Sequence, residues 1–125
     1  MTYRLDSDFP RPYGRLIRKT ATTNKAEIDA FISSAASRPN LMAWLVSNCH
    51  TKSRREDFAA SLSQHLELDV FGGCGRACDD GRAEEDKCSD MMAREYRFYL
   101  ALENAVCQDY ITEKVRSFNL RQENV

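Results

Sequence analysis

The chain has 125 residues, enough for one domain with its own hydrophobic core but not for several. With 42% hydrophobic and 30% charged residues, it falls outside the composition typical of disordered proteins. Its formal net charge of -1 excludes a general attraction to nucleic acid or to an anionic membrane, so any bound anion must meet local cations.

Residues 1–22 predict an extended segment with a turn, because Pro10, Pro12 and Gly14 interrupt a stretch without apolar periodicity. Asp6-Ser7-Asp8 in this segment is similar to the aspartate pair that holds a metal and a nucleotide-sugar diphosphate in one class of sugar transferases. Since the pair stands ahead of any strand–helix unit, a structural role is favoured over metal binding.

Two helices are predicted from capping patterns. Asn24 followed three residues later by Glu27 is typical of a helix start, and an apolar stripe follows at Ile28, Phe31, Ile32 and Ala35. Ser53 and Glu56 have the same spacing and precede a second stripe at Phe58, Ala59, Leu62 and Leu66.

Three short apolar runs, residues 41–47, 68–71 and 97–102, predict strands covered on both faces. A Cys-, Gly- and Asp-rich loop to Lys87 and a short helix near residues 90–95 separate the last two runs, and a final helix is expected near Asp109 or Tyr110. This alternation indicates an α/β fold with a parallel sheet. The longest apolar run is too short to span a membrane, and no signal segment opens the chain.

The five cysteines are many for a small cytosolic domain and indicate an oxidising compartment: Cys49, Cys74, Cys78, Cys88 and Cys107. Because five is odd, at least one thiol lacks a disulfide partner within the chain. Cys74, Cys78 and Cys88 form a CxxxC pair followed by a third cysteine, whereas structural zinc favours CxxC-type pairs and a fourth ligand, so disulfides or free thiols are favoured over a metal. Which cysteines pair stays open.

Polar or glycine residues follow each predicted strand, at Ser47-Asn48, Gly72-Gly73 and Glu103-Asn104. Ligands of open parallel sheets bind at the carboxyl ends of the strands, where these residues meet. Arg55 and Lys114 add cations, and a helix that begins near Tyr110 would offer free N–H groups to a phosphate. The sequence therefore predicts a site for a phosphate-bearing ligand at this edge.

Most of these residues also have a simpler interpretation. Arg55 near a helix start is typical of a solvated surface, and Glu113 beside Lys114 is compatible with an exposed helix face. Tyr110 can pack its ring on the sheet. Glu103 is harder to explain in this way, because a carboxylate at the end of an apolar strand needs a partner or water.

Four segments in this order resemble the α1,3-fucosyltransferases of glycosyltransferase family 10: YRLDSDFPRPYG, AWLVSNC, LDVFGGCG and FYLALENAVCQDYITEKV. The last is similar to that family's F-Y-L-x-F-E-N-S stretch followed by D-Y-I-T-E-K. The resemblance extends from Thr2 to about Val115 and is nearest to the Cys-rich core fucosyltransferases of invertebrates. It departs from the pattern at Leu102 and Ala105, where the family has Phe and Ser.

The resemblance implies a GT-B architecture of two Rossmann-like domains, with GDP-fucose in the C-terminal one. Residues 1–22 would be a linker from the acceptor domain, and residues 23–125 an incomplete donor domain. The implied reaction is inverting transfer of L-fucose from GDP-fucose to N-acetylglucosamine of a glycan or glycoprotein acceptor, in α1,3 linkage. It implies no metal cofactor and no nucleic acid, and a general base in the acceptor domain.

Carried onto this chain, these expectations give a donor site of seven residues: Asn48, Arg55, Glu103, Asn104, Tyr110, Glu113 and Lys114. Arg55 and Lys114 would contact the phosphates, and Tyr110 the nucleotide or phosphate. Glu113 would bind fucose or ribose hydroxyls, while Glu103 and Asn104 would shape the pocket. Loss of Lys114 would weaken donor binding by about one to two orders of magnitude.

The chain is expected to be a fragment or a truncated product, because the family extends beyond both of its ends. Full-length members are expected on the lumenal side of Golgi membranes, through an anchor outside this chain. An unpaired sheet edge and a lack of transfer activity in isolation follow from that expectation. The alternative is a non-enzymatic interaction domain stapled by disulfides in the loop from Cys74 to Cys88.

Overall fold

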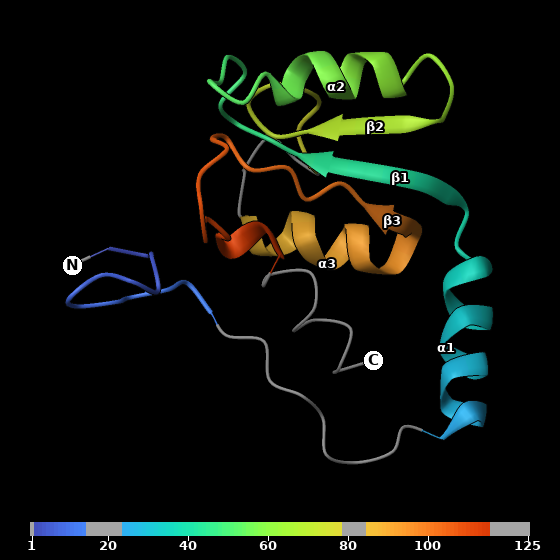
Figure 1. Ribbon diagram of the computed structural model, residues 1–125. Helices are drawn as coiled ribbons and strands as arrows, with labels where there is room; N and C mark the ends of the chain where they lie inside the picture. Colours follow the sequence, from blue (N-terminus) through green and yellow to red (C-terminus); the bar gives the residue numbers. More distant parts are fainter. Residues whose placement is uncertain (1, 15–23, 79–84, 116–125) are drawn as a thin grey trace.

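The computed structural model describes residues 2–14, 24–78 and 85–115 (Figure 1). The elements are α1 (Lys25–Ala36), β1 (Asn40–Leu45), α2 (Arg55–Leu62), β2 (Leu68–Phe71), α3 (Glu85–Glu95) and β3 (Tyr96–Tyr99). The three predicted strands are confirmed, although β3 is shorter than its apolar run. The predicted helix near residues 90–95 is also confirmed and begins earlier than expected.

The three strands form one parallel sheet in the order β2-β1-β3. Leu45 of β1 pairs with Phe71 of β2, and Asn40 of β1 pairs with Tyr96 of β3. Helix α2 covers one face of the sheet and α3 covers the other (Figure 1). The α/β class is therefore confirmed, as a partial Rossmann-like sheet with flanking helices.

The core has two layers because successive residues of β1 point to opposite faces of the sheet. On the α3 side, the buried cluster is Ala43, Phe71, Cys78, Cys88, Met92 and Tyr96. On the α2 side, it is Trp44, Val46 and Ala59. The sheet is thus packed on both faces, which fixes its strand ends as a stable platform.

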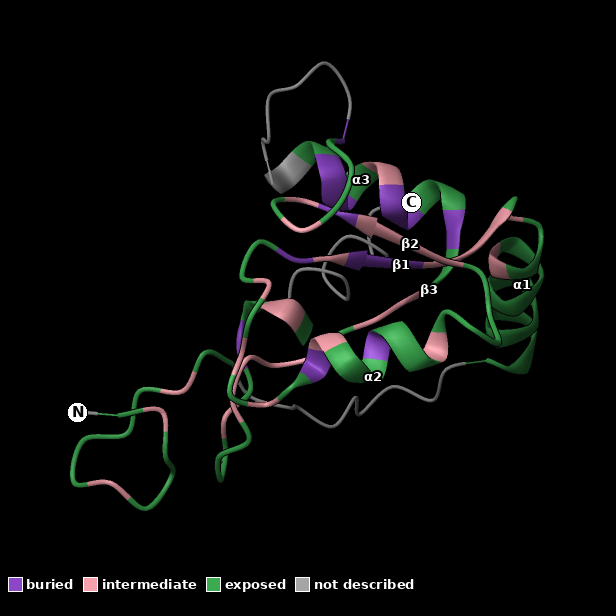
Figure 2. Cartoon of the chain, turned by 90° about the horizontal axis from the view of Figure 1, so that it is seen from above, coloured by how far each residue is buried: buried purple, intermediate pink, exposed green. Residues whose placement is uncertain are grey.

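Helix α1 begins as predicted but does not contribute to the core. The Asn24 side chain accepts a hydrogen bond from the backbone N–H of Ala26 at 2.9 Å, and Glu27 accepts one from Asn24 N–H at 3.3 Å. No residue of α1 is buried, and its apolar side chains Ile28, Phe31 and Ile32 are about half exposed (Figure 2). The apolar stripe therefore predicted the helix correctly but not its burial.

The predicted capping box of α2 is wrong. The helix is preceded by Arg54, whose φ of 54° is left-handed and whose side chain makes no capping bond. The Glu56 carboxylate instead accepts hydrogen bonds from Thr51 N–H and Oγ1–H, both at 2.8 Å. Ser53 is used elsewhere, and α2 ends at Leu62, short of Leu66. The capping pattern is present in the sequence, but Thr51 donates to the Glu56 carboxylate and Ser53 donates to the carbonyls of residues 103 and 104.

Two disulfides tie the loops after β1 and β2 into the fold. Cys49 pairs with Cys74 across the two loops, and Cys78 pairs with Cys88 on α3, whereas the Cys107 thiol is free. Between them Gly75 passes so close to β2 that an added Cβ would lie 2.1 Å from the Val70 carbonyl oxygen. The expectation of at least one unpaired thiol is confirmed.

The predicted final helix does not begin at Asp109 or Tyr110. Asp109 has a left-handed φ of 59°, and the chain becomes helical only at residue 113. Tyr110 therefore sits in an irregular segment rather than at a helix start. Residues 79–84, within the predicted loop, and the residues after 115 lie outside the described residues.

Residues 2–14 fold back on themselves, with Thr2 bridged to Pro10, in keeping with the predicted turn. This segment reaches the segment that follows β3. Asp109 accepts a hydrogen bond from Leu5 N–H at 3.3 Å, and the rings of Tyr3 and Tyr110 lie 4.8 Å apart. The N-terminal segment thus packs beside the carboxyl edge of the sheet.

Candidate functional site

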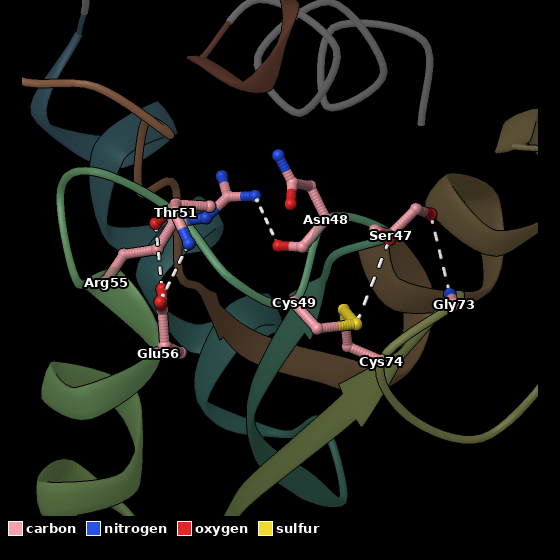
Figure 3. Close-up of a disulfide and its surroundings, with 8 residues drawn as sticks. All are labelled: Ser47, Asn48, Cys49, Thr51, Arg55, Glu56, Gly73 and Cys74. Carbon is pink, nitrogen blue, oxygen red and sulfur yellow. Dashed lines mark hydrogen bonds between the residues drawn. A yellow bond between two sulfur atoms is a disulfide. The ribbon is translucent and has the colours of Figure 1, made fainter.

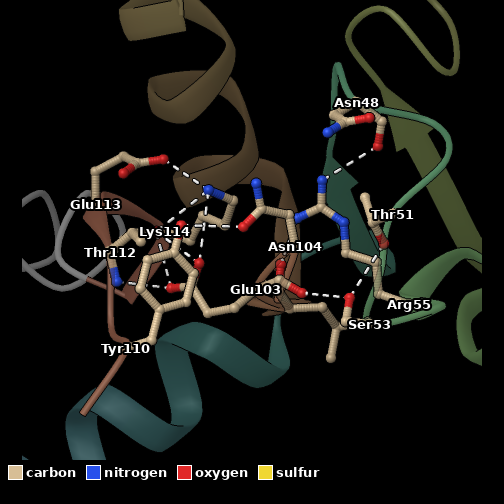
Figure 4. A network of polar contacts seen from close by, with 11 residues as sticks. Asn48, Thr51, Ser53, Arg55, Glu103, Asn104, Tyr110, Thr112, Glu113 and Lys114 are labelled. Carbon is tan, nitrogen blue, oxygen red and sulfur yellow. Dashed lines mark hydrogen bonds and ion pairs between the residues drawn. The ribbon is translucent and has the colours of Figure 1, made fainter. Parts of the chain in front are cut away.

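The polar residues predicted to meet at the carboxyl edge of the sheet do meet there. The loop after β1 carries Ser47 and Asn48, and Ser47 lies beside Gly73 of the loop after β2 (Figure 3). The segment that follows β3 carries Glu103 and Asn104, between Arg55 on one side and Lys114 on the other (Figure 4). The edge therefore presents two cations to one neighbourhood.

Arg55 is the first residue of α2 and is buried, with 5% of its surface exposed, so the solvated interpretation is wrong for it. Its Nη1 donates to the Leu102 carbonyl at 2.7 Å and its Nη2 to the Asn48 carbonyl at 3.2 Å. Nε has no partner, and no carboxylate forms an ion pair with Arg55 among the described residues. Its positive charge is therefore uncompensated by any acid in that part of the chain.

Three successive carbonyls after β3 are bonded to Ser53 and to Arg55, the first residue of α2. Arg55 takes the first, at Leu102, while the Ser53 hydroxyl donates to Glu103 O at 2.8 Å and Ser53 N–H to Asn104 O at 3.3 Å. Because these bonds use only the backbone of residues 102–104, the side chains of Glu103 and Asn104 stay available for the opposite side of the site.

Glu103 uses both carboxylate oxygens on that opposite side (Figure 4). Oε1 accepts from Thr112 N–H at 2.7 Å, and the Thr112 hydroxyl lies 2.8 and 2.7 Å from Oε1 and Oε2. Lys114 Nζ lies 3.7 Å from Oε2. The expected need of this carboxylate for a partner is met within the chain.

Lys114, unlike Arg55, is a cation that lies beside two carboxylates. Its Nζ lies 2.7 Å from Glu113 Oε1 and 3.2 Å from the Thr112 hydroxyl, and 21% of its side chain is exposed. Burial raises the pKa of Glu113, but the hydrogen bond and charge of Lys114, together with hydrogen bonds from the Glu113 backbone and Thr112, outweigh it and lower the pKa of that carboxyl. Lys114 therefore shares its charge with two carboxylates.

The Tyr110 ring packs against the ring of Tyr3. Its hydroxyl donates to the Asn104 side-chain oxygen at 3.0 Å. Burial, followed by the charge of Glu103, raises the pKa of Tyr110. Asn48 contributes its carbonyl to Arg55, while the residue itself is exposed.

A cavity of about 520 Å³ lies elsewhere, on the α3 face of the sheet. Its lining includes Phe71, Arg76, Lys87, Arg94 and Tyr96, and none of the seven predicted site residues. The expected hollow between Arg55 and Lys114 is thus not this cavity. The convergence of cations and strand ends, rather than the size of a hollow, identifies the candidate site.

Other sequence features have structural partners. Asp6 is paired with Arg4, and Cys74, Cys78 and Cys88 are in disulfides. In residues 2–14, 24–78 and 85–115, no three His, Cys, Asp or Glu residues are placed to hold a metal ion. Across the same residues, every helix is too short or too polar to cross a membrane.

Two residues of the site were missed from the sequence, Ser53 and Thr112. Thr112 is 3% exposed and joins Glu103 to Lys114, and Ser53 joins the two loops. Ser53 was assigned to a helix cap, and a lone threonine carries no pattern of its own. The signal that was available for Thr112 is its place two residues before Lys114.

The parallel sheet, the helices on both faces and the polar strand ends define a Rossmann-like α/β domain. The model of glycosyltransferase family 10 (fucosyltransferase), C-terminal part, matches residues 35–125. The chain belongs to this family. That membership does not favour the alternative of a non-enzymatic, disulfide-stapled domain.

Named relatives agree with the family. The chain is 38% identical to α-(1,3)-fucosyltransferase fut-1 of Caenorhabditis elegans, across 90% of this chain and 26% of that protein. It is 37% identical to glycoprotein 3-α-L-fucosyltransferase A of Drosophila melanogaster, across 96% and 24%, and 36% identical to α-(1,3)-fucosyltransferase C of the same species, across 92% and 30%. The chain thus spans 24% to 30% of the length of these curated relatives.

Proposed function

We propose that this chain supplies the GDP-binding part of an α1,3-fucosyltransferase. The whole enzyme would transfer L-fucose, with inversion, from GDP-fucose to N-acetylglucosamine of a glycan or glycoprotein, in protein glycosylation on the lumenal side of Golgi membranes. Residues 23–125 would belong to the donor domain and residues 1–22 to the linker before it. The acceptor site and the general base would lie in the part of the enzyme outside this chain.

The buried charge of Arg55 carries this proposal. A buried cation is normally paired, because desolvation of an isolated charge is costly. Arg55 bonds to two carbonyls and lies 5.8 Å from the centroid of the Trp44 ring, contacts that stabilise a guanidinium but leave its net charge in place. A diphosphate at the adjacent strand ends would supply the missing negative charge, and arginine is well suited to phosphate oxygens.

Lys114 would act with Arg55 on the departing diphosphate, in place of a metal ion. When a nucleotide arrives, the Lys114 ammonium exchanges part of its contact with Glu113 for a phosphate oxygen. Glu113, half exposed, then becomes available to hydroxyls of the fucose or ribose. Tyr110 offers its ring edge to the nucleotide while its hydroxyl stays on Asn104.

Calorimetry with GDP tests the proposal. We expect the chain to release binding heat, and the double variant Arg55→Ala, Lys114→Ala to bind at least about a hundredfold more weakly, because two charge-assisted contacts are removed. Circular dichroism should confirm that both proteins are folded. Equal heats for the two proteins would remove these residues from the site.

A further inference from the structure

Both oxygens of the Glu103 carboxylate are engaged by groups of the protein. Its oxygens accept from Thr112 N–H and from the Thr112 hydroxyl, and Lys114 Nζ lies within 3.7 Å. The Glu103 side chain is 15% exposed and Thr112 is 3% exposed, so these contacts are protected from water. A carboxylate committed in this way has little capacity left for a sugar hydroxyl or a ribose.

We infer that Glu103 and Thr112 are positioning residues that set the Lys114 ammonium at the strand-end edge, and that neither binds the donor. This inference rests on the proposed function and changes the role of Glu103 within it. We call the unit formed by Glu103, Thr112 and Lys114 the lysine clasp.

The clasp works through the position of Thr112, directly before the helical residues 113–115. N–H groups at a helix start have no partner inside the helix, and a side-chain acceptor there fixes where the helix begins. The Thr112 hydroxyl oxygen accepts from Lys114 Nζ, and its hydrogen is donated to Glu103. Glu103 thus anchors the segment from a distance of nine residues along the chain.

The Thr112 hydroxyl also orients the Lys114 ammonium, since it donates a hydrogen bond to Glu103 and accepts one from Lys114 Nζ at 3.2 Å. A hydroxyl can do both, whereas an apolar group of the same shape can do neither. The backbone of Glu103 is bonded to Ser53, beside Arg55. The clasp therefore fixes the position of Lys114 relative to Arg55 at the carboxyl edge of the sheet.

Two substitutions of one residue separate positioning from packing. Thr112→Val keeps the branched shape and removes the hydroxyl, whereas Thr112→Ser removes a methyl group and keeps the hydroxyl. We expect Thr112→Val and Glu103→Gln to bind GDP about tenfold more weakly than the unaltered chain, and Thr112→Ser to stay within about twofold. Wild-type affinity in Thr112→Val, or equal losses in the Val and Ser variants, would overturn the inference.

A second measurement needs no nucleotide. The rate at which an acylating reagent modifies Lys114, read by mass spectrometry, reports how firmly its ammonium is held, and the exposed Lys52 is an internal reference. We expect Lys114 to react faster than in the unaltered chain in Thr112→Val and Glu103→Gln, and at an unchanged rate in Thr112→Ser, always relative to Lys52. Unchanged rates in all three variants would contradict the clasp.

The two measurements fail in different ways. If the unaltered chain binds no GDP, the proposed function fails, and the acylation rates still decide whether Lys114 is positioned by Glu103 and Thr112. If GDP binds to every variant alike, the proposed function stands and the clasp fails. Should Thr112→Val not fold, Glu103→Gln and Thr112→Ser still give opposite expected results.

Discussion

The two cations at the carboxyl edge of the sheet are held in opposite ways. Arg55 is buried and bonded only to backbone carbonyls, so its place depends on the fixed fork of the guanidinium. Lys114 is partly exposed and lies among carboxylates and a hydroxyl, so its place depends on a point charge. The comparison teaches that one cation is built into the fold, while the other can be exchanged between protein and ligand.

Exchanging arginine and lysine at these two positions keeps both positive charges and tests the difference directly. These substitutions have the largest expected effect on GDP binding. Arg55→Lys loses the fork and at least one of two charge-assisted bonds, so we expect GDP binding about thirtyfold weaker. Lys114→Arg keeps a charge among the same acids, and we expect a change of at most about threefold. Calorimetry of the two variants should show this order, and the opposite order would refute the comparison.

When the Lys114 side chain is removed, we expect the loss of GDP binding to fall at the lower end of the predicted one to two orders of magnitude. The reason is that Glu113 and Glu103 already compensate its charge before a ligand arrives.

The two disulfides provide a matched pair for the next prediction. Cys49 follows Asn48, whose carbonyl bonds to Arg55 (Figure 3). Cys78 and Cys88, the latter on α3, belong to the buried core cluster. Removing either bridge should cost about 2–5 kcal/mol of stability. In conditions where both variants are folded, Cys49→Ala, Cys74→Ala should bind GDP about threefold more weakly, or about 0.7 kcal/mol. Binding by Cys78→Ala, Cys88→Ala should be unchanged, and an equal loss in both would contradict a link between the first bridge and Arg55.

The smallest effect concerns Glu56, which fixes the loop before Arg55 without touching the edge. Hydrogen bonds from Thr51 N–H, its own backbone N–H and the Thr51 hydroxyl lower the pKa of Glu56 from 4.5 to about 2. Because the folded pKa lies below the unfolded one, this contribution to stability is complete above pH 4.5 and is lost as the pH falls towards 2. Thermal unfolding of Glu56→Gln should therefore depend less on pH in that window than that of the unaltered chain. Identical pH profiles would show that these bonds add nothing.

Much of the fold could be predicted because its signals are local. The apolar run of β1 and the cap at Asn24 depend on neighbouring residues, and both were correct. The start of α2 could not be predicted, because Glu56 bonds to Thr51 while Ser53 bonds to the distant carbonyls of residues 103 and 104. The exposure of α1 had no local signal either, since an apolar stripe does not state what covers it.

The candidate site shows the same division. The strand-end rule brought Arg55, Glu103 and Lys114 together from sequence alone. It did not reveal that Arg55 is buried, or that Glu103 is committed to Thr112, because both depend on contacts across 47 and nine residues of chain. The disulfide pairing was equally out of reach, since five cysteines allow several arrangements.

The most direct measurement follows the side-chain Nε–H signal of Arg55 by NMR while GDP is added to the isotope-labelled chain, with Arg55→Lys used to assign the signal. If a diphosphate settles against this guanidinium, the signal should move progressively and reach saturation together with the calorimetric heat. If GDP binds with measurable heat while the signal does not shift, the nucleotide binds elsewhere and Arg55 has only a structural role, joining two loops through its hydrogen bonds.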